Sequence, residues 1–178
     1  MKIGIDIDDT ICDTTDIVHL KLEEYSKLID LNPIDIMNDE ELRLNFFNIY
    51  LEDIYTNVTI KKSCVDVIKR LHSKGNEIYL ITARTNGIYN VGDITRDWLA
   101  KNGIIYDKLV LSCYGITKAR ACKAYDIDIM IDDDPYNYKQ ITSIGINCLL
   151  FDDKAKYELK NNYVTSWFEV EKYIEGMI

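Results

Sequence analysis

Apolar runs alternate with amphipathic stretches along most of the chain, and this alternation predicts strands connected by helices. The apolar runs are rich in Ile, Leu and Val with little polar alternation, as expected of parallel strands covered on both faces. Five such runs are found, at residues 2–6, 77–84, 107–112, 128–133 and 146–151. The pattern therefore predicts a protein of the α/β class built around a parallel sheet.

Helical signals fill the gaps between the later strands. Helices are predicted at residues 64–75, 92–103 and 116–126. Asp93 is the expected N-cap of the second of these. Pro135 is expected in the first turn of a further helix. Near the end of the chain, Ser166 and Glu169 have the spacing of a capping box.

The segment 13–60 breaks the alternation, because it carries no strand signal. Its first half has one apolar helical face, and its second half, after Pro33, is a second helical stretch. The apolar residues of the two halves are Val18, Leu22, Tyr25 and Ile29, and then Leu42, Phe46, Phe47, Tyr50, Leu51 and Ile54. An ordinary crossover needs far fewer residues. We therefore expect a core domain at 1–12 and 61–178 and a helical cap at 13–60 that covers the strand ends.

Composition narrows the possible partners. The chain has 178 residues, of which 47% are hydrophobic, which is enough for one core with a small inserted module. The net charge of −9 argues against a nucleic-acid polymer or an anionic membrane as partner. No segment approaches the roughly 20 apolar residues of a membrane span.

Cysteine and histidine usage points to a reducing compartment without a zinc site. The five cysteines are odd in number and lack metal-type spacing, so we expect buried thiols in a cytoplasmic protein. Asp6 interrupts the first apolar run early, so no signal peptide is expected. With two histidines in the chain, a histidine-rich zinc site is improbable.

Polar residues stand at four predicted strand ends or just beyond them. They are Asp6, Asp8 and Asp9, then Thr82, Ala83 and Arg84, then Lys118, and finally Asp132, Asp133 and Asp134. The carboxyl ends of parallel strands meet at one edge of a sheet, where ligands bind. Carboxylates there suit Mg²⁺, while a hydroxyl and an ammonium group suit phosphate oxygens. One carboxylate can attack phosphorus and a second can transfer the proton, so the set predicts magnesium-dependent phosphate chemistry.

The motifs resemble those of the haloacid dehalogenase-like (HAD) phosphatase superfamily. The resemblance rests on "DIDDT", "YLIT", Lys118 and "MIDDD", in that order, and it covers nearly the whole chain. It implies a Rossmann-like parallel sheet with helices on both faces and an aspartyl-phosphate intermediate. It further implies that Asp6 is the nucleophile, Asp8 the general acid and base, and Thr82 the group that holds the phosphoryl. Lys118 would neutralise the charge of the phosphoryl group and of Asp6.

The same resemblance implies a Mg²⁺ site. Asp6 and Asp132 would bind the ion directly, and Asp8 would offer its backbone carbonyl. Asp133 would act through water or hold Lys118. Asp134 has no role in the family and is expected to be a turn residue before the proline.

A narrower resemblance concerns the substrate. "GIDIDDT", "LITAR", "TRDWLAKNGIIYDKL" and "MIDDDPYN" are similar to bacterial and phage relatives of the cytosolic 5′(3′)-deoxyribonucleotidases. This implies that cap aromatics stack on the base, with Phe46, Phe47 and Tyr50 as candidates, although aromatics at helical spacing are more often core. Ala83 and Arg84 are candidate substrate contacts. Arg84 would reach the phosphate or sugar, or else form an ion pair at the surface.

Other functions remain open from the sequence. The same chemistry fits a phosphorylated sugar, amino acid or cofactor as the small-molecule substrate, or a phosphotransferase or mutase. A receiver-type signalling domain is disfavoured, because there the lysine follows all the acids, whereas Lys118 precedes Asp132. A catalytically dead binding module is disfavoured by the complete motif set. Either a monomer or a homodimer is compatible with the sequence.

Overall fold

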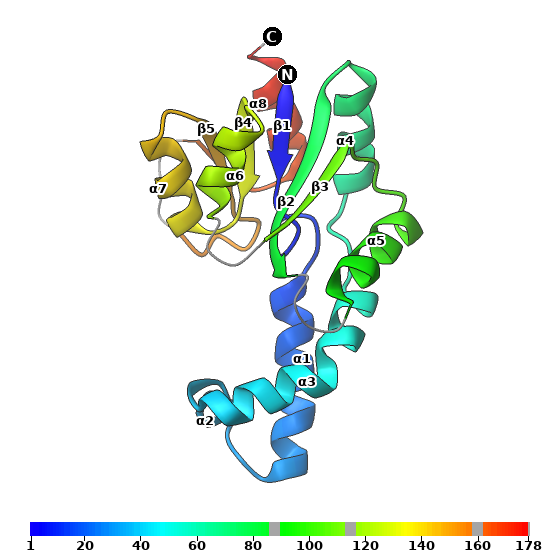
Figure 1. The fold of residues 1–178 in the computed structure, drawn as a ribbon, viewed down its shortest axis with the longest axis vertical. Helices are drawn as coiled ribbons and strands as arrows, with labels where there is room; N and C mark the ends of the chain where they lie inside the picture. Colours follow the sequence, from blue (N-terminus) through cyan, green and yellow to red (C-terminus); the bar gives the residue numbers. More distant parts are fainter. Residues whose placement is uncertain (86–89, 113–116, 158–161, 178) are drawn as a thin grey trace.

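A six-stranded parallel sheet forms the centre of the molecule in the computed structural model, which describes residues 1–85, 90–112, 117–157 and 162–177 (Figure 1). The spatial order of the strands is β3-β2-β1-β4-β5-β6. Their bounds are β1 Lys2–Ile5, β2 Glu77–Thr85, β3 Lys108–Ser112, β4 Ile129–Asp132, β5 Asn147–Phe151 and β6 Tyr163–Val164. The α/β class and the five predicted strands are confirmed. The two-residue strand β6 was not predicted, because it is too short to show a periodic pattern.

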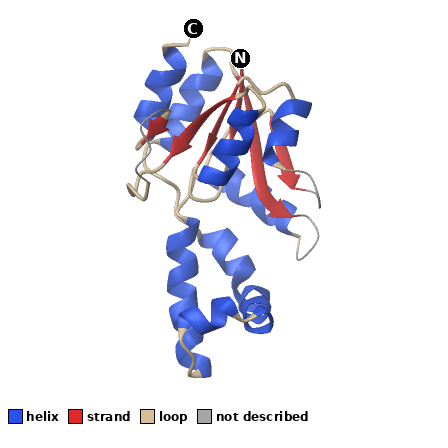
Figure 2. Ribbon diagram, turned by 90° about the vertical axis from the view of Figure 1, so that its left-hand side faces the viewer, coloured by secondary structure: helices blue, strands red, loops and turns tan. Residues whose placement is uncertain are grey.

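Helices cover both faces of the sheet (Figure 2). One face packs against α4 (Cys64–Ser73), α5 (Val91–Lys101) and α8 (Trp167–Glu175), and the other against α6 (Lys118–Ala124) and α7 (Pro135–Ser143). Successive strand residues point to opposite faces. Ile3 and Ile5 of β1 accordingly belong to the first core, while Met130 of β4 belongs to the second.

Residues 13–60 form a helical insertion that projects from the edge of the sheet where the strands end (Figures 1 and 2). It consists of α1 (Thr14–Ile29), α2 (Pro33–Asn38) and α3 (Glu40–Asn57). The insertion has an apolar cluster of its own, made of buried Leu22, Tyr25, Ile36, Phe46 and Ile54. Most of the insertion is therefore packed around its own core, while Val58 near its end belongs to the apolar core of the sheet.

Two helix boundaries differ from the prediction. The second helical stretch of the insertion is divided, because Asp39 has an extended backbone and its carboxylate caps α3 by accepting from Leu42 N at 3.0 Å. Helix α5 begins at Val91 after Asn90, so Asp93 is not its N-cap but lies in the first turn. There the Asp93 carboxylate accepts a hydrogen bond from Arg96 at 2.8 Å.

The insertion joins the core through two adjacent chain segments. Asp13 N donates to Thr59 O at 2.9 Å, and Lys61 N donates to Ile11 O at 2.8 Å. The buried Lys61 ammonium lies 2.6 Å from a carboxylate oxygen of Asp13 and 2.6 Å from one of Asp153. Ion pairs and backbone hydrogen bonds thus fix the point at which the chain leaves the core and returns.

Membrane-spanning segments and cysteines were also the subject of predictions from the sequence. Within the described residues, no helix combines the length and apolar character that a membrane crossing requires. Cys12, Cys64, Cys122 and Cys148 are buried free thiols, as expected, and Cys113 lies outside the described residues.

Candidate active site

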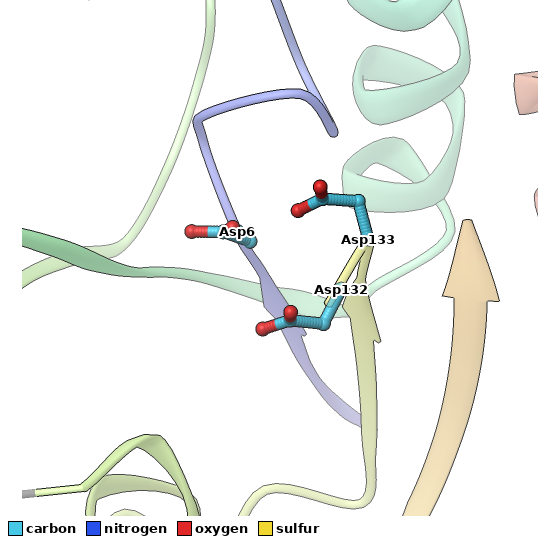
Figure 3. Close-up of side chains that lie close together, drawn as sticks. All are labelled: Asp6, Asp132 and Asp133. Atoms are coloured by element: carbon cyan, nitrogen blue, oxygen red, sulfur yellow. The ribbon is translucent and has the colours of Figure 1, made fainter. Parts of the chain in front are cut away.

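Sheet register brings two of the predicted acids together. Ile5 of β1 pairs with Ile131 of β4, so the residues that follow, Asp6 and Asp132, lie side by side on one face. Asp6 N donates to Ile131 O at 2.9 Å, which continues the ladder to this point. Asp133 follows Asp132, and oxygens of the three carboxylates lie within 4.8 Å of one another (Figure 3).

Lys118 joins this group from the first turn of α6. Its Nζ lies 2.7 Å from Asp6 Oδ2 and 2.8 Å from Asp132 Oδ2. Burial disfavours the ammonium, but the charges of Asp6 and Asp132 outweigh that cost and raise the pKa of Lys118. Lys118 is therefore a fixed positive charge between two carboxylates.

One carboxylate oxygen of this group, Asp6 Oδ1, differs from the others in its hydrogen bonding. Asp6 Oδ1 is buried and finds no hydrogen-bond donor among the residues that the structure describes. Burial, reinforced by Asp132, Asp8 and Asp133, raises the pKa of Asp6 well above its ordinary value despite Lys118. An unpartnered carboxylate oxygen beside two further carboxylates is the donor set that a hard divalent cation prefers, so these residues fit Mg²⁺.

Asp133, like Asp6, lies close to other carboxylates whose negative charge disfavours its ionised form. Burial and then the neighbouring Asp132 raise the pKa of Asp133 to about 7. Its Oδ1 accepts from the hydroxyl of Thr10 at 3.5 Å, at the limit of a hydrogen bond. A bound cation would relieve this repulsion.

Asp132 is oriented by its own neighbours. Its Oδ1 accepts from Asp134 N at 3.0 Å and from Asn137 Nδ2 at 3.1 Å. Asp134 in turn caps α7 by accepting from Tyr136 N at 2.8 Å. Asn137 was not predicted as part of the site; its place in "DDDPYN", one helical turn after the acids, was the available signal.

Asp8 lies on the side of the site that faces the insertion. Arg84 Nη2 lies 2.7 Å from Asp8 Oδ1 and Arg84 Nε lies 3.0 Å from Asp8 Oδ2, so the guanidinium binds both oxygens. The first residue of α1, Thr14, donates to Asp8 Oδ1 at 2.6 Å. Burial opposes ionisation of Asp8, but the Arg84 charge and these hydrogen bonds outweigh it and lower the pKa of Asp8.

Arg84 is an internal residue, not the surface residue that one prediction allowed. It is 2% exposed, and its Nη1 donates to the Thr95 hydroxyl at 3.3 Å. Its guanidinium lies 4.0 Å from the ring centroid of Tyr55, which belongs to α3 of the insertion. Tyr55 was missed by the sequence reasoning, because nothing local distinguishes it from the other insertion aromatics.

Thr82 and Ala83 lie at the same edge of the sheet as Asp6. Leu80 of β2 pairs with Ile5, and Thr82 follows two residues later. The buried Thr82 hydroxyl accepts from Arg84 N at 3.2 Å, while Ala83 is exposed. Thr82 and Lys118 also border a largely apolar cavity of about 440 Å³.

The candidate base-stacking residues lie in the insertion. Phe46 is completely buried and packs against Tyr25, with ring centroids 5.8 Å apart, and against Tyr50, at 5.3 Å. A ring without exposed area has no free face to offer a base, so the burial of Phe46 favours a role in the core of the insertion over the predicted stacking. Phe47 and Tyr50 are half-buried around it.

The sheet order and the helical insertion after the first strand give the chain the fold of HAD-type hydrolases. Solved structures share this fold. A haloacid dehalogenase-like family hydrolase from Streptococcus pneumoniae superimposes with a TM-score of 0.76 at 14% identity, covering 97% of both chains. A HAD-hydrolase from Bacillus subtilis that is described as bound to magnesium has a TM-score of 0.71 at 13% identity, covering 98% of both chains.

Sequence comparison identifies the family. The model of the family described as 5′ nucleotidase, deoxy (pyrimidine), cytosolic type C protein matches residues 1–177, and the chain belongs to this family. A Bacillus cereus protein described provisionally as a nucleotidase is 25% identical over 189 residues, covering 98% of each chain. The chain is thus a phosphoric monoester hydrolase of a nucleotidase family, with the fold of HAD-type hydrolases.

Proposed function

We propose that this chain is a magnesium-dependent 5′-nucleotidase that hydrolyses (deoxy)nucleoside monophosphates through an aspartyl phosphate on Asp6. The observation that carries this proposal is the unpartnered Asp6 Oδ1, which lies beside Lys118, Asp132 and Asp133. Family membership supports the substrate class. The family's cytosolic description also supports the cytoplasmic location expected from the cysteines.

In the first half of the reaction, a carboxylate oxygen of Asp6 attacks phosphorus and the bond to the ester oxygen breaks. Asp8, which takes up a proton from solvent when the substrate binds, gives that proton to the ester oxygen, so the alcohol leaves neutral. Asp8 is held ionised by Arg84 in the free site, but the negative charge of a phosphate ester beside it opposes that effect. Lys118 and Thr82 hold the transferring phosphoryl group.

In the second half, a water molecule attacks the phosphoryl group on Asp6. Asp8, now a carboxylate, accepts a proton from this water, and the bond between phosphorus and Asp6 breaks. Release of phosphate restores both side chains. Asp8 then releases to solvent the proton that it took from water, and returns to the ionised state that its ion pair with Arg84 favours.

Asp6, Asp132 and Asp133 would hold Mg²⁺ through their carboxylates, and Asp8 through its backbone carbonyl. Bound Mg²⁺ supplies positive charge that keeps the carboxylates ionised and balances the charge of phosphate. Asn137 and Asp134 N keep Asp132 oriented for this task.

The insertion at 13–60 would act as a cap over the core domain formed by 1–12 and 61–178. Its separate apolar cluster and its position beyond the strand ends support this division. Phe47 and Tyr50 remain candidates for stacking on the base, since both are half-buried. Ala83, which is exposed, remains a candidate substrate contact.

The test is a phosphatase screen with deoxynucleoside and nucleoside monophosphates, sugar phosphates and phosphoamino acids, with and without magnesium. We expect activity that needs magnesium and prefers deoxynucleotides. The Asp6→Asn variant should lose at least about a thousandfold in kcat, because it removes the nucleophile. Circular dichroism should show that it stays folded.

Preference for a sugar or amino-acid phosphate would replace the substrate class while leaving the chemistry intact. An Asp6→Asn variant with activity near that of the native chain would contradict the assigned nucleophile. Inactivity of the native chain on every substrate would overturn the proposed function.

A further inference from the structure

Arg84 occupies a position between the site and the cap. Its guanidinium is enclosed on several sides: the Asp8 carboxylate binds Nε and Nη2, the Thr95 hydroxyl accepts from Nη1, and the Tyr55 ring covers the guanidinium at 4.0 Å. The side chain has no exposed area. All five donors of a guanidinium are fixed in one plane, so these partners leave little freedom to the Asp8 carboxylate.

The partners of Arg84 come from separate parts of the fold. Asp8 follows β1, Thr95 lies on α5 in the core, and Tyr55 lies on α3 in the insertion. The contact with Tyr55 is therefore a cation–π contact across the boundary between cap and core. Because the guanidinium is shielded from water, this contact is stronger than one at the surface and favours one arrangement of the two parts.

We propose that Arg84 is a positioning residue, which aims the Asp8 carboxylate at the ester oxygen, and that Tyr55 holds Arg84 in place when the cap is docked. This inference rests on the proposed function, because it concerns proton transfer by Asp8. Arg84 itself acts through Asp8 and not on the substrate. The role differs from the phosphate or sugar contact that the sequence suggested for Arg84.

The proposed role of Arg84 predicts different effects for substrates whose leaving groups differ in their need for a proton from Asp8. A nucleoside leaves as an alcohol and needs a proton, whereas p-nitrophenol leaves readily as its anion. A misplaced Asp8 should therefore slow the release of a nucleoside far more than that of p-nitrophenol. The value of kcat/KM reports the steps up to this release, so the ratio of kcat/KM for the two substrates isolates the effect.

The experiment compares kcat/KM for a deoxynucleoside monophosphate and for p-nitrophenyl phosphate in the native chain and in Arg84→Lys. Lysine keeps the charge but cannot bind both oxygens of Asp8 in a fork. We expect the nucleotide value to fall at least tenfold and the p-nitrophenyl value to change by less than about threefold. Arg96→Lys, at an exposed arginine paired with Asp93, is the matched control and should leave both values unchanged.

Tyr55 provides a second, independent variant. Tyr55→Leu removes the ring over the guanidinium and should shift the ratio in the same direction by a smaller factor, about threefold to tenfold. Tyr55→Phe retains the ring and should restore the native ratio. These variants keep the inference testable if Arg84→Lys does not fold.

Two outcomes would overturn the inference alone. Equal losses on both substrates with a raised KM would make Arg84 a phosphate contact, and an unchanged ratio in Tyr55→Leu would remove the link to the cap. A native chain without phosphatase activity would overturn the proposed function and this inference with it. The two failures are therefore distinguishable.

Discussion

Asp6 has two carboxylate oxygens in different environments, and this difference defines the site at the scale of single residues. Oδ2 is bound to the Lys118 ammonium at 2.7 Å, while Oδ1 is buried without a donor in the described part of the chain. Burying an unpaired charge is costly. A proton or a cation at Oδ1 would therefore stabilise the arrangement, in keeping with the raised pKa of Asp6.

Asp132→Asn tests the cation site. The amide keeps the shape and can still accept from Asp134 N, while Lys118 retains its pair with Asp6, so the variant should stay folded. Loss of one charged ligand should weaken magnesium binding at least about tenfold. Isothermal calorimetry measures the affinity. Asp97→Asn, at an exposed acid of α5, is the control, and equal affinities in the two variants would contradict the assignment of Asp132.

At the scale of helices and strands, the aromatic residues of the insertion differ in where they lie. Its helices pack an aromatic cluster inside, with Phe46 at the centre, while Tyr55 lies close to Arg84. Aromatics at similar helical spacing therefore have different tasks. A ring at the centre of the cluster stabilises the insertion, and a ring near the boundary with the core can act on the site.

Phe46→Ala tests this division within α3. Removing a fully buried ring should lower the free energy of unfolding of the insertion by about 3–5 kcal/mol. Phe47→Ala should cost less, since Phe47 is half-buried. Hydrogen exchange of the insertion amides measures both effects.

Leu44→Ala is the control for the Phe46 experiment, at a residue of α3 that is 53% exposed, and it should change stability by less than about 0.5 kcal/mol. If Phe46→Ala left the insertion as stable as this control but abolished nucleotide binding, Phe46 would be a substrate contact after all.

At the scale of the whole molecule, repulsion among the buried carboxylates of the site makes the free energy of unfolding depend on pH. The pKa of Asp133 rises from 3.8 to about 7 on folding, because of burial and the charge of Asp132. The pKa of Asp6 is raised as well. The folded chain therefore binds more protons than the unfolded chain between about pH 4 and 7, so stability falls as pH rises through this range. The lowered pKa of Asp8 acts in the opposite direction, but below this range.

We therefore expect the metal-free protein to melt several degrees higher at about pH 5.5 than at about pH 7.5. Each proton involved changes stability by about 1.4 kcal/mol per pH unit while it is being released. Magnesium should raise the melting temperature most at the higher pH and flatten the dependence, because it favours ionised carboxylates. Scanning calorimetry in chelator and in excess magnesium measures this. A metal-free melting temperature that rises over the same range would contradict the charge assignment.

The sequence alone predicted the strands, the inserted helices and the acids at the strand ends. These features follow from local patterns: buried parallel strands are continuous apolar runs, and adjacent parallel strands bring their carboxyl ends to one edge. The family resemblance added roles for Asp6, Asp8, Thr82 and Lys118, which remain proposals. The start of α5 at Val91 and the strand β6 were not predicted, because capping geometry and short pairings depend on few residues.

Only the tertiary structure decided which side chains are internal and which of them meet. Arg84 and Asp8 are 76 residues apart in the chain. Tyr55 contacts Arg84 from α3, and the sequence does not show whether the side of α3 that carries Tyr55 faces the core or the solvent. The same holds for Phe46, whose spacing fits both a core and a binding surface. Local sequence determines which face of an element is apolar, but burial depends on what packs against that face. For this reason the acids and the lysine near the strand ends could be predicted from the chain, and the contacts of Arg84 with Asp8 and Tyr55 could not.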